Sequence, residues 1–210
     1  FKREYFKYAT LQNGILDLGE FKKCILRNCK IFQTCDPAVS TQDSADYFVL
    51  GTWAQTPDYD LVLLNIHRTR LESPDQVNLF KQGYSRWKPA QQWVETNGIG
   101  KTLYQSLTRS GLPVKKLSAD SDKVTRAYPT AARMEAGTIY FLQGQSWLPD
   151  FEEELLSFPN GSHDDQVDVL SYAGQVVIES IYGLDNLDLS QLICAKKPPS
   201  WVVLDEFCLP

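Results

Sequence analysis

The sequence predicts an α/β protein with a mixed sheet, in which the first three strands are antiparallel and the later ones parallel. Three runs rich in β-forming residues follow one another between residues 29 and 66, separated by short turns, which is typical of an antiparallel meander. Helix-like and strand-like segments then alternate as far as residue 182, a pattern that favours parallel strands joined by helices. With 210 residues, the chain can bury a core without disulfide bonds or a structural metal.

The three adjacent strands are expected at residues 30–35, 47–53 and 61–66. The first of them ends at Asp36-Pro37, because proline cannot donate a hydrogen bond to a neighbouring strand. Turn-forming residues at 56–60 separate the second from the third.

The later segments change period. Ser73-Pro74-Asp75 predicts a helix start, with serine as the cap and proline at the first helical position. The strongest helical stripe, residues 163–182, carries apolar side chains at a helical spacing. The other elements are expected as strands at 92–95, 112–114 and 139–142, and as helices at 98–109, 120–135 and 151–158.

These elements define the expected organisation. Residues 1–27 are interpreted as a linker or an edge segment, residues 28–182 as the domain itself, and residues 183–210 as a C-terminal tail with an edge strand near 201–204. The chain does not begin with methionine, so we expect it to be a fragment whose natural N-terminus lies upstream. No apolar run approaches the roughly 18 residues needed to span a bilayer, so no membrane segment is expected.

Charge is distributed unevenly along the chain. The net charge is −5, yet residues 1–135 carry 19 Lys and Arg against 14 Asp and Glu, whereas residues 136–210 carry 2 against 12. A basic body with an acidic C-terminal third leaves nucleic-acid binding open, although a solvated acidic tail would give the same pattern. Five cysteines without a CxxC motif and only two histidines argue against a zinc site of standard spacing and favour a reducing cytoplasm.

Acidic residues mark the ends of several predicted elements. Asp36 ends the first strong strand, Glu95 ends the fourth, and three aspartates open the last helix, namely Asp164, Asp165 and Asp168. Strand ends and helix starts converge at one edge of an α/β sheet, and converging carboxylates would need a cation. Hard oxygen ligands suit Mg²⁺ or Mn²⁺, and two such ions would position a phosphodiester for attack by water. The alternative is that Asp36 serves only in a turn and the aspartates only as helix caps.

A glycine-rich segment and a histidine are two further candidates for functional roles. Gly98-Ile99-Gly100-Lys101-Thr102 is similar to the end of a phosphate-binding loop, but Glu95 stands where that motif requires a glycine, so an ATPase site is not expected. His163 precedes the aspartates; it is either a residue at the helix entry without chemistry or a proton shuttle.

Three segments together resemble the nuclease domain of the large terminase subunits, which package DNA in tailed bacteriophages. They are Asp36-Pro37-Ala38, the turn Val94-Glu95-Thr96-Asn97-Gly98, and His163-Asp164-Asp165-Gln166-Val167-Asp168-Val169-Leu170-Ser171. Stretches at 123–127, 131–137 and 153–159 support the resemblance, which covers about residues 28–182.

This resemblance implies a ribonuclease H-like fold and a two-metal endonuclease that cuts concatemeric viral DNA during genome packaging. It implies Asp36, Glu95 and an aspartate of the last motif as the catalytic acids; we favour Asp165, with Asp164 and Asp168 as further metal ligands. Mg²⁺ or Mn²⁺ would be the cofactor. The full-length proteins of the family also have an N-terminal packaging ATPase. No Walker motif stands in these 210 residues, so we expect an isolated C-terminal domain. The small terminase subunit and the portal are expected partners in the host cytoplasm.

Double-stranded DNA requires a basic surface to approach such an acidic site. The candidates lie in and after the fifth strand: Lys115, Lys116, Lys123, Arg126 and Arg133. Two alternatives to the terminase interpretation remain open. One is a non-catalytic module that docks on DNA or the portal, and the other is a nuclease of the same fold that resolves Holliday junctions.

Overall fold

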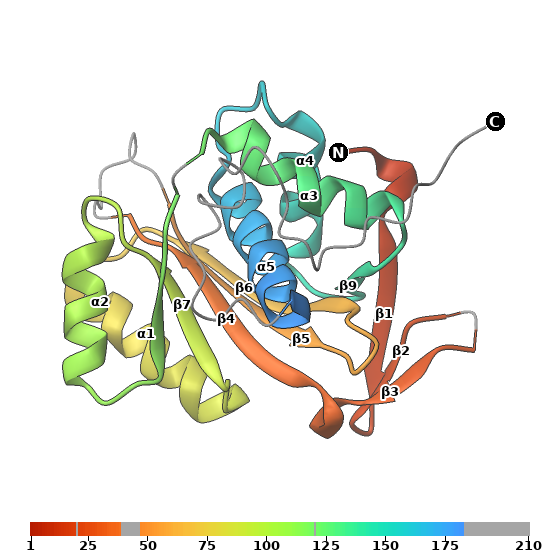
Figure 1. Cartoon of the computed structure of the whole chain (residues 1–210), viewed down its shortest axis with the longest axis horizontal. Helices are drawn as coiled ribbons and strands as arrows, with labels where there is room; N and C mark the ends of the chain where they lie inside the picture. The colour runs from red at the N-terminus through yellow and green to blue at the C-terminus, as the bar shows by residue number, and fades with distance from the viewer. Residues whose placement is uncertain (20, 39–46, 120, 183–210) are drawn as a thin grey trace, which may run out of the picture.

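In the part of the chain that the structure describes, residues 1–19, 21–38, 47–119 and 121–182, nine strands form one mixed sheet (Figure 1). The computed structural model orders the strands β3-β2-β1-β9-β6-β5-β4-β7-β8. The centre of the sheet is an antiparallel meander of β4 (Lys30–Asp36), β5 (Phe48–Gln55) and β6 (Leu61–Thr69). This confirms the expected fold class.

Parallel strands extend the meander on both sides. β7 (Gln91–Glu95) pairs parallel with β4, and β8 (Val114–Leu117) pairs parallel with β7. On the other side, β9 (Ile139–Leu142) lies parallel to β6. Because β4 and β7 run in the same direction, their last residues reach the same edge of the sheet.

Helices connect and cover these strands. One group is α1 (Ser73–Trp87) and α2 (Gly100–Arg109), and the other is α3 (Lys123–Glu135), α4 (Leu148–Ser157) and α5 (Asp165–Tyr182). Proline lies in the first turn of α1, as its sequence predicts, although the residue in the cap position is Glu72. Within the described residues, no helix combines the length and apolar character that a bilayer span requires.

The two groups of helices cover opposite faces of the sheet. Along β4, Phe32 packs in the cluster that includes α5 residues, whereas Cys35 packs with Phe80 of α1 and Leu103 of α2. Side chains alternate between the faces of a strand, so residues an even number of positions from Phe32 point toward α5. Figure 1 shows α5 lying across the middle of the sheet, with α3 and α4 beside it.

Specific contacts hold α5 close to the sheet. The hydroxyl of Thr34 donates a 2.9 Å hydrogen bond to the carbonyl of Val169, and the Trp53 indole donates to the same hydroxyl at 2.8 Å. A Cβ added at Gly51 would lie 2.7 Å from Cγ1 of Val169, so only glycine permits this approach. α5 is therefore set in position by β4 and β5 together.

The segment expected to be a linker or an edge segment belongs to the sheet. After the 3-10 turn Arg3–Tyr5, residues 1–27 form β1 (Lys7–Gln12), β2 (Ile15–Asp17) and β3 (Lys23–Ile25), and a second 3-10 turn, Leu26–Asn28, leads into β4. β1 pairs parallel with β9, and Leu16 of β2 is fully buried. A linker is therefore the wrong description, whereas β3 is an edge strand. The tail at 183–210, including the strand expected near 201–204, lies outside the described residues.

Candidate active site

Asp36 and Glu95 end two neighbouring parallel strands and point to the same face. Asp36 lies two residues after Thr34, which contacts α5, and Glu95 lies two residues after Trp93, which packs in the same cluster. Alternation along the strands therefore places both carboxylates on the α5 side of the sheet. The nearness of Glu95 contributes to the raised pKa of Asp36.

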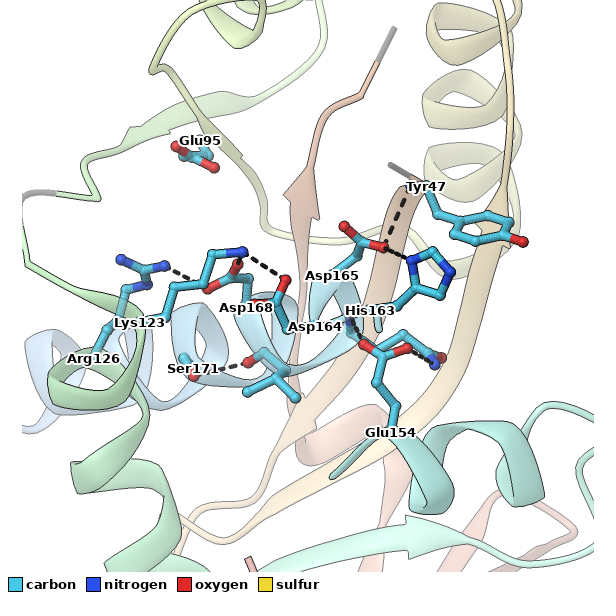
Figure 2. A network of polar contacts seen from close by, with 12 residues as sticks. Tyr47, Glu95, Lys123, Arg126, Glu154, His163, Asp164, Asp165, Asp168 and Ser171 are labelled. Carbon is cyan, nitrogen blue, oxygen red and sulfur yellow. Dashed lines mark hydrogen bonds and ion pairs between the residues drawn. The ribbon is translucent and has the colours of Figure 1, made fainter. Parts of the chain in front are cut away.

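The N-terminus of α5 brings the aspartates to this edge. Asp165 and Asp168 are buried, with 5% and 4% of their surface exposed, whereas about a third of the Asp164 side chain remains accessible. The backbone N–H of Tyr47, immediately before β5, donates to Oδ2 of Asp165 at 3.4 Å. Figure 2 shows Asp165 directed toward β5 and Asp168 directed toward α3.

The electrostatics of Asp36 show that these carboxylates converge. Burial raises the pKa of Asp36 well above its ordinary value, and the negative charges of Asp168, Glu95 and Asp165 raise it further. The same charges act on Tyr172 of α5, whose pKa is raised by burial and then by Asp36, Asp168 and Glu95. Four carboxylates on three elements thus create one region of concentrated negative potential.

Two cations from α3 compensate part of this charge. Nζ of Lys123 lies 2.6 Å from Oδ1 of Asp164 and 3.2 Å from Oδ2 of Asp168. Nη2 of Arg126 lies 2.5 Å from Oδ1 of Asp168 (Figure 2). Both residues were expected on a DNA-binding surface, and their ion pairs with the aspartates were not expected from the sequence. In the structure they contribute to the site itself.

The donor chemistry suits a hard divalent cation, although the ligands are not gathered around one point. Among the described residues, no three His, Cys, Asp or Glu side chains are grouped closely enough to hold a metal ion. The oxygens of Asp36, Glu95, Asp165 and Asp168 are nevertheless the type that Mg²⁺ and Mn²⁺ prefer. The unfavourable ionisation of Asp36 is what a cation would relieve.

Tyr172 is a site residue that sequence reasoning missed. Its hydroxyl donates a 2.9 Å hydrogen bond to Oε2 of Glu95, and its ring lies 5.4 Å from the guanidinium carbon of Arg126. The available signal was its position one helical turn after Asp168, on the same face of α5. That spacing is equally typical of a core residue.

Glu154 of α4 is a second residue that the sequence did not single out. Its Oε1 accepts the backbone N–H of Gln166 at 2.6 Å, and its Oε2 accepts the Gln166 side-chain amide at 2.7 Å. Arg68 lies 3.6 Å from Oε2. The first turn of a helix has N–H groups without partners inside the helix, and here a carboxylate from another helix satisfies one of them. Glu154 thereby fixes the end of α5 that carries the aspartates.

His163 lies beside the site. Its Nδ1 is 4.0 Å from Oδ2 of Asp165, and its ring packs edge-on against Tyr47 with centroids 5.2 Å apart. The guanidinium carbons of Arg68 and Arg70 lie 3.9 and 4.1 Å from the centroid of the same Tyr47 ring. Positive charge therefore flanks the Asp165 side of the site.

The other candidate DNA-binding residues lie in different places. Lys115 packs over the Trp93 ring and Lys116 over the Tyr104 ring, so they leave β8 in different directions. Arg133 is at the far end of α3, where Nη2 donates to the carbonyl of Tyr59 at 2.5 Å. Ten residues of helix separate Arg133 from Lys123, about 15 Å at the usual rise. The five candidates do not form one patch.

The glycine-rich turn after Glu95 has a steric role. A Cβ added to Gly100, the first residue of α2, would lie 1.8 Å from the carbonyl oxygen of Glu95 and 2.9 Å from Cγ of Pro37. Only glycine fits where the chain turns from β7 into α2. The turn therefore packs directly against the two strand ends that carry Asp36 and Glu95.

A comparison with protein families matches residues 33–175 to the terminase RNaseH-like domain. The chain belongs to this terminase family. The match begins within β4 and includes β5, β6, both strand-end acids and the first eleven residues of α5. No curated protein sequence matches this terminase domain.

Solved structures share the fold of this terminase domain at low sequence identity. The large terminase nuclease from thermophilic phage G20c with bound magnesium is 17% identical, with a TM-score of 0.61 over 82% of this chain and 93% of that one. The nuclease domain of the Thermus phage P74-26 large terminase is 16% identical, with a TM-score of 0.58 over 80% and 89%. The human cytomegalovirus terminase nuclease domain, soaked with manganese and with an inhibitor bound, is 13% identical, with a TM-score of 0.55 over 87% and 95%.

Proposed function

We propose that this terminase domain is a metal-dependent endonuclease that cuts double-stranded DNA during viral genome packaging by two-metal phosphodiester hydrolysis. The observation that carries the proposal is geometric: Asp36 and Glu95 end neighbouring parallel strands on the face covered by α5, whose first turn holds the buried Asp165 and Asp168. Buried charges of one sign are retained where a ligand of the opposite sign compensates them. The phage G20c nuclease has been solved with magnesium, cobalt and zinc, which supports a divalent cation as that ligand.

In this proposal Asp36, Glu95 and Asp165 are the principal ligands of Mg²⁺ or Mn²⁺, and Asp164 and Asp168 complete the set. Bound divalent ions lower the pKa of a water and stabilise negative charge on the leaving oxygen. The protein holds its carboxylates on rigid elements: two strand ends in the sheet and a helix start capped by Glu154. Rigid placement of the ligands is what this chemistry needs.

His163 is the proton shuttle in this proposal. Its Nδ1 lies 4.0 Å from Oδ2 of Asp165, and about a third of its side chain is accessible to solvent. A histidine beside the carboxylates can act as a general acid or base. Its assignment as a shuttle remains a proposal, as does the contact of Lys115, Lys116, Lys123, Arg126 and Arg133 with DNA.

The partners follow from the family. We propose that a packaging ATPase domain, the small terminase subunit and the portal bring DNA to this domain in the host cytoplasm. The net charge of −5 supports a need for such partners, because an acidic domain repels the phosphate backbone.

A cleavage assay on supercoiled plasmid tests the proposal. With Mg²⁺ or Mn²⁺ we expect nicked and linear products, and with EDTA none. Asp36→Asn should reduce cutting by at least about 100-fold, because loss of a metal-organising acid removes several kcal/mol of stabilisation. Asp75→Asn, an exposed carboxylate on α1 across the sheet, is the matched control and should cut normally.

The choice of DNA separates this proposal from its alternatives. A docking module would bind plasmid without cutting it at any metal concentration. A junction resolvase would cut a four-way junction in strong preference to linear duplex. We expect linear duplex to be cut as efficiently as the junction, and either opposite result would overturn the assignment.

A further inference from the structure

The side chain of Lys123 occupies a position between the carboxylates of Asp164 and Asp168. Lys123 is the first residue of α3, and its ammonium contacts Asp164 at 2.6 Å and Asp168 at 3.2 Å. The ammonium of Lys123 is therefore held between two carboxylates from another helix.

Arg126, one turn later, makes a different kind of contact. Only 9% of its side chain is exposed, whereas 49% of the Lys123 side chain is. The Arg126 guanidinium also donates to the carbonyl of Ser121 at 2.7 Å and lies over the Tyr172 ring. Several contacts thus fix Arg126, while Lys123 contacts Asp164 and Asp168 at the end of a flexible four-carbon stem.

We infer that Lys123 is an exchangeable internal cation: it occupies the aspartates in the metal-free protein, leaves them when a divalent ion binds, and is then free to contact a DNA phosphate. Arg126 stays on Asp168 throughout. The inference rests on the proposed function, because it assumes that a divalent ion binds here.

The physical argument is one of competing charges. An ammonium brings one positive charge and a divalent ion brings two, so the ion is favoured on a cluster of carboxylates. The pair of Lys123 with Asp164 is partly exposed and therefore weak, and the buried Asp168 keeps Arg126 as a partner when Lys123 leaves. In the structure Asp164 and Asp168 are directed toward the cations of α3 (Figure 2).

Calorimetric titration with Mn²⁺ tests the exchange without measuring cleavage. Lys123→Met retains the length of the side chain but removes the competing charge, so it should bind Mn²⁺ about three- to tenfold more tightly than wild type. Lys123→Arg keeps the charge and should bind with wild-type affinity. Lys81→Met, an exposed lysine on α1 across the sheet, is the control for a general change in net charge and should shift affinity by less than about twofold.

Each outcome has a defined meaning. If Lys123→Met binds Mn²⁺ no more tightly than wild type does, the exchange is overturned. Equal affinity would mean that Lys123 does not compete with the metal, and weaker binding by the variant would mean that Lys123 helps to position the metal ligands. If wild type binds no Mn²⁺, or binds it equally well as Asp36→Asn, the proposed function fails instead. Circular dichroism verifies folding, and if Lys123→Met is unfolded without metal, Lys123→Gln replaces it in the same titration with the same expected result.

Discussion

The hydroxyl of Tyr172 donates a 2.9 Å hydrogen bond to Oε2 of Glu95 and thereby joins the middle of α5 to the end of β7. Tyr172 is fully buried, and its raised pKa keeps the hydroxyl protonated as a donor at any working pH. This bond fixes the orientation of Glu95 relative to Asp168, which lies one turn earlier on the same helix. It makes Tyr172 a positioning residue for the carboxylates.

Tyr172→Phe should weaken metal binding while the fold persists. Loss of a hydrogen bond that orients a metal ligand typically costs about 10-fold or more in affinity or activity. Calorimetry with Mn²⁺ should show that loss, and urea denaturation should show a decrease of only about 1 kcal/mol in the free energy of unfolding. Tyr128→Phe, on the exposed side of α3, should change neither. Wild-type Mn²⁺ affinity in Tyr172→Phe would remove the positioning role.

Asp36 should make the stability of the metal-free protein depend on pH. Because its pKa is raised in the folded state, the folded protein holds this proton to a higher pH than the unfolded chain does. The free energy of unfolding should therefore fall as the pH rises above about 4, until the folded-state carboxyl has ionised. Each unit of pKa difference corresponds to about 1.4 kcal/mol.

Asp36→Asn cannot ionise, so its stability relative to wild type should increase as the pH rises above about 4. Urea denaturation in EDTA at several pH values measures the difference. Asp75 is an exposed carboxylate, so the free energy of unfolding of Asp75→Asn should differ from that of wild type by an amount that does not vary with pH. A constant difference for Asp36→Asn as well would show that Asp36 ionises normally in the folded protein.

Glu154→Ala should destabilise the domain more than a substitution at its neighbour. The change leaves the N–H of Gln166 without its buried partner and leaves Arg68 without its carboxylate. Hydrogen bonds to a charged group contribute about 1.5–3 kcal/mol each, so a loss of about 2–4 kcal/mol is expected in urea denaturation. Glu153→Ala, an exposed residue on the same helix, should cost less than about 0.5 kcal/mol. Equal effects of the two substitutions would argue against the capping role.

DNA binding should depend on Lys123 only when a divalent ion is bound. With Ca²⁺ in place of Mg²⁺ to limit cleavage, wild type should lose affinity steeply as salt increases. Lys123→Ala should lower the slope of log affinity against log salt by about one, the value for one phosphate contact. In EDTA the two proteins should have the same slope. Lys116→Ala, on β8, provides a comparison with another candidate contact. If the salt slope of Lys123→Ala equals that of wild type both with Ca²⁺ and in EDTA, the duplex does not contact Lys123.

Local patterns in the sequence were sufficient for most of the elements. The runs of β-forming residues predicted the meander, and Ser73-Pro74 predicted α1, because period and capping are properties of neighbouring residues. The β1–β2 hairpin was missed although Asn13-Gly14 signals a two-residue turn, and both residues have positive φ there. Its strands are too short for alternation to stand out, and their burial depends on pairing with the distant β9.

For the site, neighbouring residues along the chain were enough to identify the acids at the ends of elements, and hence the resemblance to terminase nucleases. The partners of these acids emerge from the packing of the fold: Tyr172 contacts Glu95, Glu154 contacts the start of α5, and Lys123 contacts Asp164. An acidic residue at a strand end can be identified from its neighbours in the chain. A contact between residues 41 or 77 positions apart depends on how helices pack across a sheet, and that packing is set by the whole core rather than by any local pattern.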